Sequence, residues 1–154
     1  MPLINIQASV PAVADANSLL QELSSKLAEL LGKPEKYVMT SLQCGVPMTF
    51  SGNTEPTCYV EVKSIGALDG SRTQEVSELV CSHIEQNLGI PADRTYIGFE
   101  DVPARLWGWN GSTFGWSDRD MPLNDCSNNL KVHEVIVRVH LASKADLTLG
   151  LTGR

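Results

Sequence analysis

The sequence predicts one α/β domain of two strand–helix–strand units, whose strands form a four-stranded mixed sheet with both helices on one face. Three observations support this fold class. The chain has 154 residues, the size of a single domain, and 42% of them are hydrophobic, which is enough for a core. An internal repeat relates positions 57 residues apart, such as Leu19 and Val76. Both copies of the repeat end in the same glycine and proline signal.

Each copy of the repeat contains a predicted amphipathic helix. Apolar residues recur at every fourth position in both copies, which keeps them near one face of a helix. They are Leu19, Leu23, Leu27 and Leu31 in the first copy, and Val76, Val80, Ile84 and Leu88 in the second. The stretch Leu31-Gly32-Lys33-Pro34 aligns with Leu88-Gly89-Ile90-Pro91. Glycine suits a helix C-cap and proline cannot continue a helix, so we predict that both helices end there.

Segments rich in β-forming residues flank both predicted helices. Residues 2–6 and 37–42 belong to the first unit, and residues 58–62 and 95–99 to the second. Such units have parallel strands and a right-handed crossover. We assign apolar side chains to both faces of the sheet, namely Ile4, Ile6, Val38, Val60, Val62 and Ile97. The face without helices would then need a cover, and a symmetric oligomer with inward-facing sheets is expected.

Composition excludes several classes of function. A formal charge of −6 and a pI near 5.0 argue against binding to nucleic acid. The sequence has no apolar run of the roughly 18 residues that a membrane helix needs, and its start does not resemble a signal peptide, so a cytoplasmic protein is expected. The cysteines have no metal-binding spacing, and we interpret them as reduced thiols: Cys44, Cys58, Cys81 and Cys126. No metal or cofactor is predicted.

Pro2 is the first candidate for a catalytic group. An initiator methionine is removed efficiently before a small residue, and the mature chain would then begin with a secondary amine. An α-amino group titrates near 7.7 to 8.0, and burial or a neighbouring cation lowers that pKa. A neutral amine at working pH can act as a general base. Proline in second position is also common without any such role.

Three further groups have both a structural and a functional interpretation. Lys33 stands where the repeat has Ile90; its charge either complements the helix dipole or lies near Pro2 and binds an anionic substrate. Ser64-Ile65-Gly66 is either a strand-to-turn transition or a place of close approach to the backbone. A dense aromatic group suits either subunit packing or a pocket wall; it comprises Trp107, Trp109, Phe114 and Trp116.

These residues resemble the macrophage migration inhibitory factor family of the tautomerase superfamily, whose enzymes use an amino-terminal proline. The resemblance covers residues 1–114, and two stretches look especially similar to the plant and protist branch, GKPEKYVM and FEDVPARLWGWNGSTF. The matching residues are Pro2, Gly32-Lys33-Pro34, residues 46–50, Glu55-Pro56, Ser64-Ile65-Gly66, Tyr96 and residues 108–114.

The resemblance implies a homotrimer with active sites between subunits. Pro2 would be the base in keto–enol tautomerisation of an arylpyruvate, a phenylpyruvate or dopachrome type of substrate. Lys33 and the Ser64-Ile65 backbone would hold the substrate. Tyr96 of a neighbouring subunit, Trp109 and Phe114 would complete an apolar pocket. No cofactor or metal is implied. Members of the family also leave cells without a signal peptide, so secretion is an alternative to the cytoplasm.

Three departures from the family pattern affect the prediction. Gly98 replaces an asparagine that binds the phenolic end of substrates in animal members, so weaker use of hydroxylated rings is expected. Thr57 and Val60 replace the CxxC cysteines, which argues against thiol–disulfide oxidoreductase activity. Residues 115–154 extend beyond the family domain. Within them, residues 135–141 alternate as one added strand would, and the extension is predicted to remodel the mouth of the pocket.

Two other functions compete with this enzyme. One is a cytokine-like interaction protein that binds a protein receptor and keeps the pocket as a vestige. The other is a tautomerase of an unknown metabolite, with incidental turnover of arylpyruvates. Pro2 and Lys33 favour an enzyme, whereas Gly98 and the extension favour divergence from the usual substrate.

Overall fold

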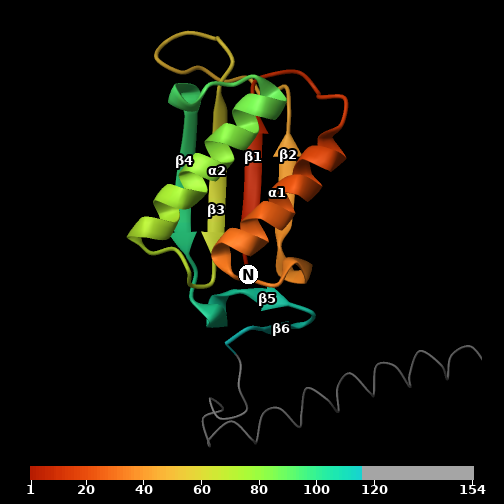
Figure 1. Ribbon diagram of the computed structural model, residues 1–154, viewed down its shortest axis with the longest axis vertical. Helices are drawn as coiled ribbons and strands as arrows, with labels where there is room; N and C mark the ends of the chain where they lie inside the picture. Colours follow the sequence, from red (N-terminus) through yellow and green to blue (C-terminus); the bar gives the residue numbers. More distant parts are fainter. Residues whose placement is uncertain (116–154) are drawn as a thin grey trace, which may run out of the picture. The chain divides into compact units, whose positions relative to one another are not determined.

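The computed structural model describes residues 1–115, which form one compact unit (Figure 1). The main elements, in chain order, are β1 (Leu3–Ala8), α1 (Ala16–Leu31), β2 (Met39–Gln43), β3 (Cys58–Ser64), α2 (Gly70–Leu88) and β4 (Thr95–Asp101). A small hairpin of β5 (Gly108–Trp109) and β6 (Ser112–Thr113) follows. Three short 3₁₀ turns lie at Glu35–Tyr37, Ala92–Arg94 and Ala104–Leu106. The strands therefore lie in the segments where the repeat predicted them.

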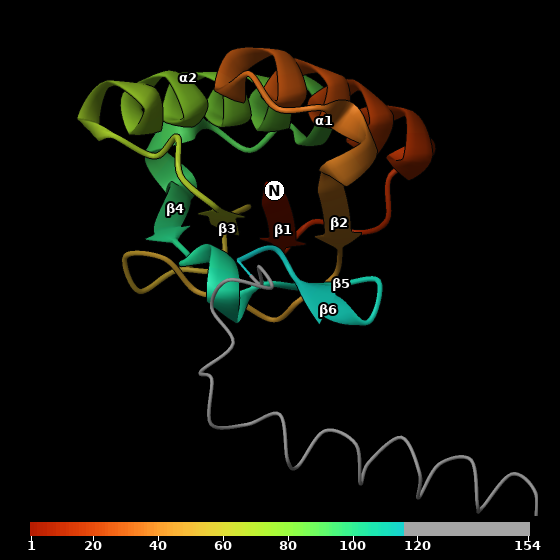
Figure 2. The same cartoon turned by 90° about the horizontal axis from the view of Figure 1, so that it is seen from below.

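The four long strands form one sheet in the order β2-β1-β3-β4. Pairing is parallel inside each unit, between β1 and β2 and between β3 and β4, and antiparallel where β1 meets β3. Both helices cover the same face of the sheet (Figure 2). The predicted α/β fold of two units with a mixed sheet and helices on one face is confirmed.

The two helices begin and end alike. Each begins after an aspartate whose side chain accepts a backbone N–H: Asp15 from Ser18 at 3.0 Å and Asp69 from Arg72 at 3.1 Å. Each ends at a glycine with positive φ, 60° in Gly32 and 65° in Gly89. Glycine adopts this left-handed conformation without the steric penalty that a Cβ would bring. The predicted stop signals thus work through the same geometry in both units.

The core lies between the helices and the sheet. Fully buried side chains of β1 and β3 meet the apolar faces of α1 and α2, with Leu23, Leu27, Val76, Val80 and Ile84 at 0% exposure. His83 is the largest polar group in this layer, and its Nε2 lies 2.9 Å from the carbonyl oxygen of Leu19. That contact joins α2 to α1 and provides the hydrogen-bond partner that a buried imidazole needs.

The register corrects one sequence argument. Ile4 pairs with Val62 and Ile6 with Val60, so these four side chains lie on the same face, under the helices. Ile97, opposite Val60, and Val38 pack against the same core. The prediction that these apolar residues occupy both faces is wrong, because alternation in single strands does not show which positions of neighbouring strands share a face until the register is known.

The open face of the sheet is mixed in character. It is polar where Ser41 Oγ donates to Asn5 Oδ1 at 2.9 Å and where Lys63 pairs with Glu100 at 2.8 Å. Its exposed large apolar or aromatic side chains are Met39, Tyr59 and Tyr96. The predicted oligomer therefore cannot be inferred from a continuous apolar face, and it rests on other grounds.

In residues 1–115, no helix has the length and apolar character needed to cross a membrane. The predicted extension from residue 115, with its added strand at residues 135–141, lies outside the described residues apart from Gly115. Cys126 also lies there, and the boundary predicted at residue 114 remains a prediction.

Candidate functional site

The start of β1 brings several predicted site residues to one end of the sheet. Pro2 is buried, and its carbonyl oxygen accepts the N–H of Met39 at 3.0 Å, which ties it to the start of β2. Because β3 is antiparallel to β1 and Lys63 pairs with Leu3, the end of β3 lies beside Pro2. The N-terminus and the β5–β6 hairpin lie at this same lower end in Figure 1.

Lys33 acts on the N-terminal amine electrostatically. Its backbone N–H donates to Ala28 at 2.9 Å, directly after the αL cap of α1, so the side chain starts at this end of the sheet. Burial and, second, the charge of Lys33 lower the pKa of the Met1 amine below the usual α-amino range. Both causes disfavour the protonated form. Removal of Met1 would transfer the terminal amine by one residue, to the buried Pro2.

The turn after β3 is held by backbone contacts. The carbonyl oxygen of Ser64 accepts the N–H of Val102 at 2.8 Å, and the N–H of Gly66 donates to Asp101 Oδ1 at 2.7 Å. Gly66 has a φ of 65°, which permits the sharp turn after Ile65. The Ser64 side chain is fully buried on the helix-covered face, and its hydroxyl has no hydrogen-bond partner among residues 1–115.

An aromatic cluster lies at the same end. Trp109 and Phe114 stack with ring centroids 5.8 Å apart, and Tyr37 meets both rings edge-on at 5.5 and 5.9 Å. A cavity of about 290 Å³ is lined by Trp109, Asn110, Ser112, Thr113 and Phe114. The sequence analysis placed Tyr37 in a strand and did not predict that it belongs to this cluster. The available signal was the Pro34-Glu35 pair, which comes shortly before Tyr37 in the sequence. Tyr37 instead ends a 3₁₀ turn that points its ring toward the hairpin.

The β5–β6 hairpin is fixed at both of its ends. Asn110 and Gly111 form its two-residue turn with φ of 50° and 78°. The N–H groups of Phe114 and Gly115 donate to Trp107 and Ala104, each at 3.1 Å. The rings that line the cavity are therefore carried by a short but well-anchored element.

Tyr96 lies at the opposite end of the sheet. It pairs with Tyr59, which in turn pairs with Gln7, at the far end of β1. Gln7 lies five positions along the chain from Pro2, about 17 Å at the usual rise per residue of a strand. Within one chain, Tyr96 and Pro2 therefore do not belong to the same site. The ring of Tyr96 is 66% exposed on the open face.

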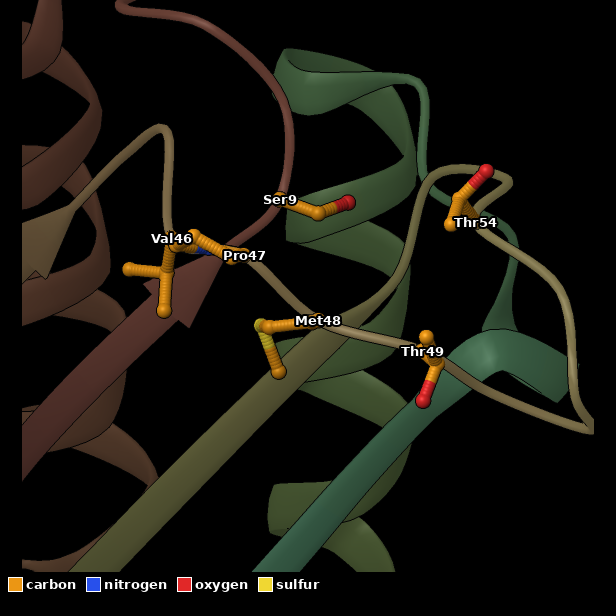
Figure 3. A pocket seen from close by; sticks show the side chains of 6 residues that line it. All are labelled: Ser9, Val46, Pro47, Met48, Thr49 and Thr54. Carbon is orange, nitrogen blue, oxygen red and sulfur yellow. The ribbon is translucent and has the colours of Figure 1, made fainter.

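A second cavity lies near that far end. It has a volume of about 420 Å³ and is lined by Ser9 and by residues of the loop after β2, namely Val46, Pro47, Met48, Thr49 and Thr54 (Figure 3). None of the predicted site residues lines it. Its polar groups are hydroxyls and backbone, and it contains no titratable side chain, so it has no candidate acid or base.

The thiols of the described residues suit packing. Cys44, Cys58 and Cys81 are all free. Burial, with the neighbouring Cys81 and Cys44, raises the pKa of Cys58 to about 12. A thiol with so high a pKa is a poor nucleophile. Residues 1–115 contain no cluster of three metal-ligating side chains.

Comparison with known proteins decides the family. Residues 1–115 match the sequence model of the family described as Macrophage migration inhibitory factor (MIF). The chain belongs to the macrophage migration inhibitory factor family. The MIF of Meriones unguiculatus is 37% identical over 114 residues, which are 74% of this chain and 99% of that protein. A MIF homologue of Trichuris trichiura is 34% identical and is covered completely. The family prediction is confirmed.

Solved structures support the same assignment. The crystal structure of a MIF homologue from Prochlorococcus marinus is 98% identical, covers 73% of this chain and 99% of its own chain, and superposes with a TM-score of 0.73. The MIF of Trichinella spiralis, at 29% identity and the same coverage, superposes with a TM-score of 0.69. The likeness extends over nearly the whole length of these relatives. MIF proteins belong to the tautomerase superfamily, whose fold this chain shares.

Proposed function

We propose that the chain is a keto–enol tautomerase of phenylpyruvate-like 2-oxo acids, with the Pro2 amine as general base. The observation that carries the proposal is the place of Pro2, which is buried at the start of β1 beside the end of β3, where burial and Lys33 lower the pKa of the adjoining Met1 amine. A neutral amine can take the proton from the carbon next to the keto group, and the resulting enolate oxygen takes a proton from solvent water to become the enol hydroxyl. In the reverse direction, the protonated amine returns that proton to the carbon.

The other groups at this end suit an aromatic 2-oxo acid. Lys33 offers a positive charge to the carboxylate, and the backbone of the Ser64-Ile65 turn offers hydrogen bonds close to Pro2. Trp109 and Phe114 line the apolar cavity that would receive the ring. Because the Ser64 side chain is buried under the helices, we expect its contribution to come from the backbone.

We further propose that the protein is a homotrimer in which each site lies between subunits. Tyr96 supports this arrangement, because it is exposed on the open face and is too far from Pro2 to serve it within one chain. A neighbouring copy can bring its own Tyr96 to the pocket. Sedimentation velocity of the processed protein would test the assembly, and a monomer would contradict it.

Steady-state kinetics test the chemistry. After mass spectrometry has shown that Met1 is absent, phenylpyruvate turnover is compared between the natural chain and Pro2→Gly. A general base contributes about 10²- to 10⁴-fold to a rate, so the variant should lose at least about a hundredfold in kcat. Equal rates in the two proteins would refute the assignment of Pro2.

Substrate preference depends on Gly98. A Cβ at this position would lie 3.2 Å from the hydroxyl of Tyr59, so the Tyr59 ring occupies the space beside the glycine. Glycine itself has no side chain that could bind the far end of a substrate. We expect 4-hydroxyphenylpyruvate to have a lower kcat/KM than phenylpyruvate, and equal or better use of the hydroxylated acid would contradict this expectation.

A second candidate function is binding of a protein receptor, as in a cytokine-like MIF. Its supporting observation is exposed apolar surface at the hairpin end, where Leu106 and Trp109 are 63% and 51% exposed. The kinetic test separates the two functions: a processed protein without turnover would favour the interaction protein.

A further inference from the structure

Arg94 holds the loop between β2 and β3 in place. Its Nε donates to the carbonyl oxygen of Pro56 at 2.8 Å, and its Nη2 donates to Asn53 Oδ1 at 2.8 Å and to the carbonyl oxygen of Glu55 at 3.1 Å. The Glu55 carboxylate lies 3.7 Å from Nη1. The Arg94 side chain is only 13% exposed. Such a planar fork with several partners fixes backbone geometry more strongly than an exposed ion pair does.

The same guanidinium also holds an aromatic ring. Its Cζ lies 5.2 Å from the centroid of Phe50, within the range of a cation–π contact. The backbone of Phe50 exchanges two hydrogen bonds of 3.1 Å with Asn53 across a tight turn, in which Ser51 and Gly52 have positive φ. The position of the Phe50 ring is therefore set by both its backbone and its neighbour.

Phe50 in turn contacts Tyr96. The two ring centroids are 4.9 Å apart with an interplanar angle of 60°. Arg94 and Tyr96 are close in sequence, one at the end of a 3₁₀ turn and the other at the start of β4. A tyrosine ring that only faces solvent does not need contacts that fix its position. A fixed ring loses less side-chain entropy when a ligand or another subunit packs against it.

We infer that Arg94 and Phe50 are positioning residues that hold the Tyr96 ring ready for the active site of a neighbouring subunit. The inference rests on the proposed function, because it needs Tyr96 to reach a site built around another copy's Pro2. The loop between β2 and β3 of each subunit thereby positions Tyr96 for the active site of the next subunit. The opposite end of the same sheet contributes Pro2 to the subunit's own active site.

Substrate affinity is the quantity that this support should change. Tyr96 would contact the substrate ring in both ground and transition states, so losing its alignment raises KM and leaves kcat and the acid limb of the pH profile unchanged. Aromatic edge contacts of this kind correspond to about a two- to tenfold change in binding. We therefore expect KM to rise by about threefold or more in Phe50→Leu and in Arg94→Met.

Two control variants isolate the effect. Phe50→Tyr retains the ring and should keep the natural KM. Lys26→Met removes the same charge as Arg94→Met, from an exposed ion pair with Glu22 on α1, and should also leave KM unchanged. Circular dichroism and sedimentation of every variant confirm that fold and assembly persist. An unchanged KM in both Phe50→Leu and Arg94→Met, with the chain folded and assembled, would overturn the inference.

Mixed oligomers test whether the support acts between subunits. Pro2→Gly chains are co-assembled in equal amounts with Phe50→Ala chains, and turnover is measured well below KM. In a cyclic trimer, about one quarter of the sites combine an intact Pro2 with an intact neighbouring loop, and about another quarter combine an intact Pro2 with an altered loop. The activity should therefore be about one quarter of the natural activity plus about one quarter of the activity of the Phe50→Ala oligomer. If Phe50 acts within its own chain, every site with an intact Pro2 carries the defect. Activity is then half that of the Phe50→Ala oligomer, and the inference is overturned.

The outcomes also separate this inference from the proposed function. A natural chain that does not turn over phenylpyruvate, or does so as fast as Pro2→Gly, refutes both. Pro2-dependent turnover with mixed oligomers only half as active as the Phe50→Ala oligomer refutes the inference alone. Mixed oligomers whose activity equals about one quarter of the natural activity plus about one quarter of the Phe50→Ala activity support both.

Discussion

The two strand–helix–strand units have the same backbone plan and different chemistry. Both helices end at an αL glycine, and both are followed by a proline and a 3₁₀ turn. Between glycine and proline, however, the first unit has Lys33, whose charge reaches the N-terminal amine, and the second has Ile90, which is completely buried. The repeated positions specify the fold, whereas the positions that break the repeat mark the candidate site.

The largest expected effect comes from giving the second unit the residue of the first. Ile90→Lys places a cation where the side chain is 0% exposed. It removes buried apolar area and adds an unpaired charge, and we expect a loss of about 4 kcal/mol in unfolding free energy. Urea denaturation at fixed protein concentration measures this loss. If the unfolding free energy falls by less than about 1 kcal/mol, the surroundings of positions 33 and 90 are more alike than the burial of Ile90 indicates.

The reciprocal change, Lys33→Ile, should affect activity instead of stability. Losing a charged contact to the substrate carboxylate predicts a fall of about thirtyfold in kcat/KM. The charge of Lys33 lowers the pKa of the Met1 amine, and we expect the same direction for the Pro2 amine of the processed chain. Removal of Lys33 should then raise that pKa and move the acid limb of the rate profile to higher pH. The base is active only above its pKa, so activity at neutral pH falls further. If the acid limb of the pH–rate profile lies at the same pH in Lys33→Ile as in the natural protein, Lys33 does not influence the pKa of the base.

How much could be predicted is clearest from these same residues. The LGxP stops and the four-residue spacing of apolar residues located both helices, because capping and amphipathicity are local properties. Strand ends were less accurate: the strand predicted at 37–42 is Met39–Gln43, and a 3₁₀ turn precedes it. The assignment of side chains to sheet faces failed since it depends on the register between strands, which no single segment encodes.

The candidate site shows the same limit. Pro2 and the Ser64-Ile65 turn come together because β1 and β3 are antiparallel, and Lys33 follows α1, which ends at the same end of the sheet (Figure 1). Tyr37 was missed because its role depends on contact with a hairpin more than seventy residues away in sequence. Tyr96 was expected from a neighbour through family resemblance alone, and its distance from Pro2 in the sheet supports that expectation physically.

A smaller loss of stability, equal in the two units, is expected from changes at the two helix C-caps. Gly32→Ala and Gly89→Ala both force a Cβ into the left-handed region, at φ of 60° and 65°, and neither Cβ would meet another atom within 4 Å. The cost is therefore conformational only, about 1 kcal/mol each. Thermal unfolding of the two variants measures it. Unequal costs would show that one cap has a further structural task.

The smallest effect concerns the start of α2. Hydrogen bonds from Arg72 and Ser71 lower the pKa of Asp69 below its usual value. A carboxylate with a lowered folded pKa contributes stability that is present above the unfolded value near 3.9 and is lost as the pH falls through the folded pKa. Asp69→Asn keeps a capping side chain, so it should flatten the acid dependence of stability below about pH 4 without changing stability at pH 7 by much. The measurement is the unfolding free energy as a function of pH, and identical curves for the natural protein and Asp69→Asn would contradict this prediction.

Pro2 lies buried at the start of β1, and under the proposed function the covalent state of its nitrogen acts as a switch. A proline nitrogen in a peptide bond has no basic lone pair to offer, so any residue attached to it keeps the site inactive. Cleavage of that peptide bond is then an irreversible activation. A purification tag fused ahead of Pro2 would keep the protein folded and silent, and cleavage of that tag directly before the proline would switch it on.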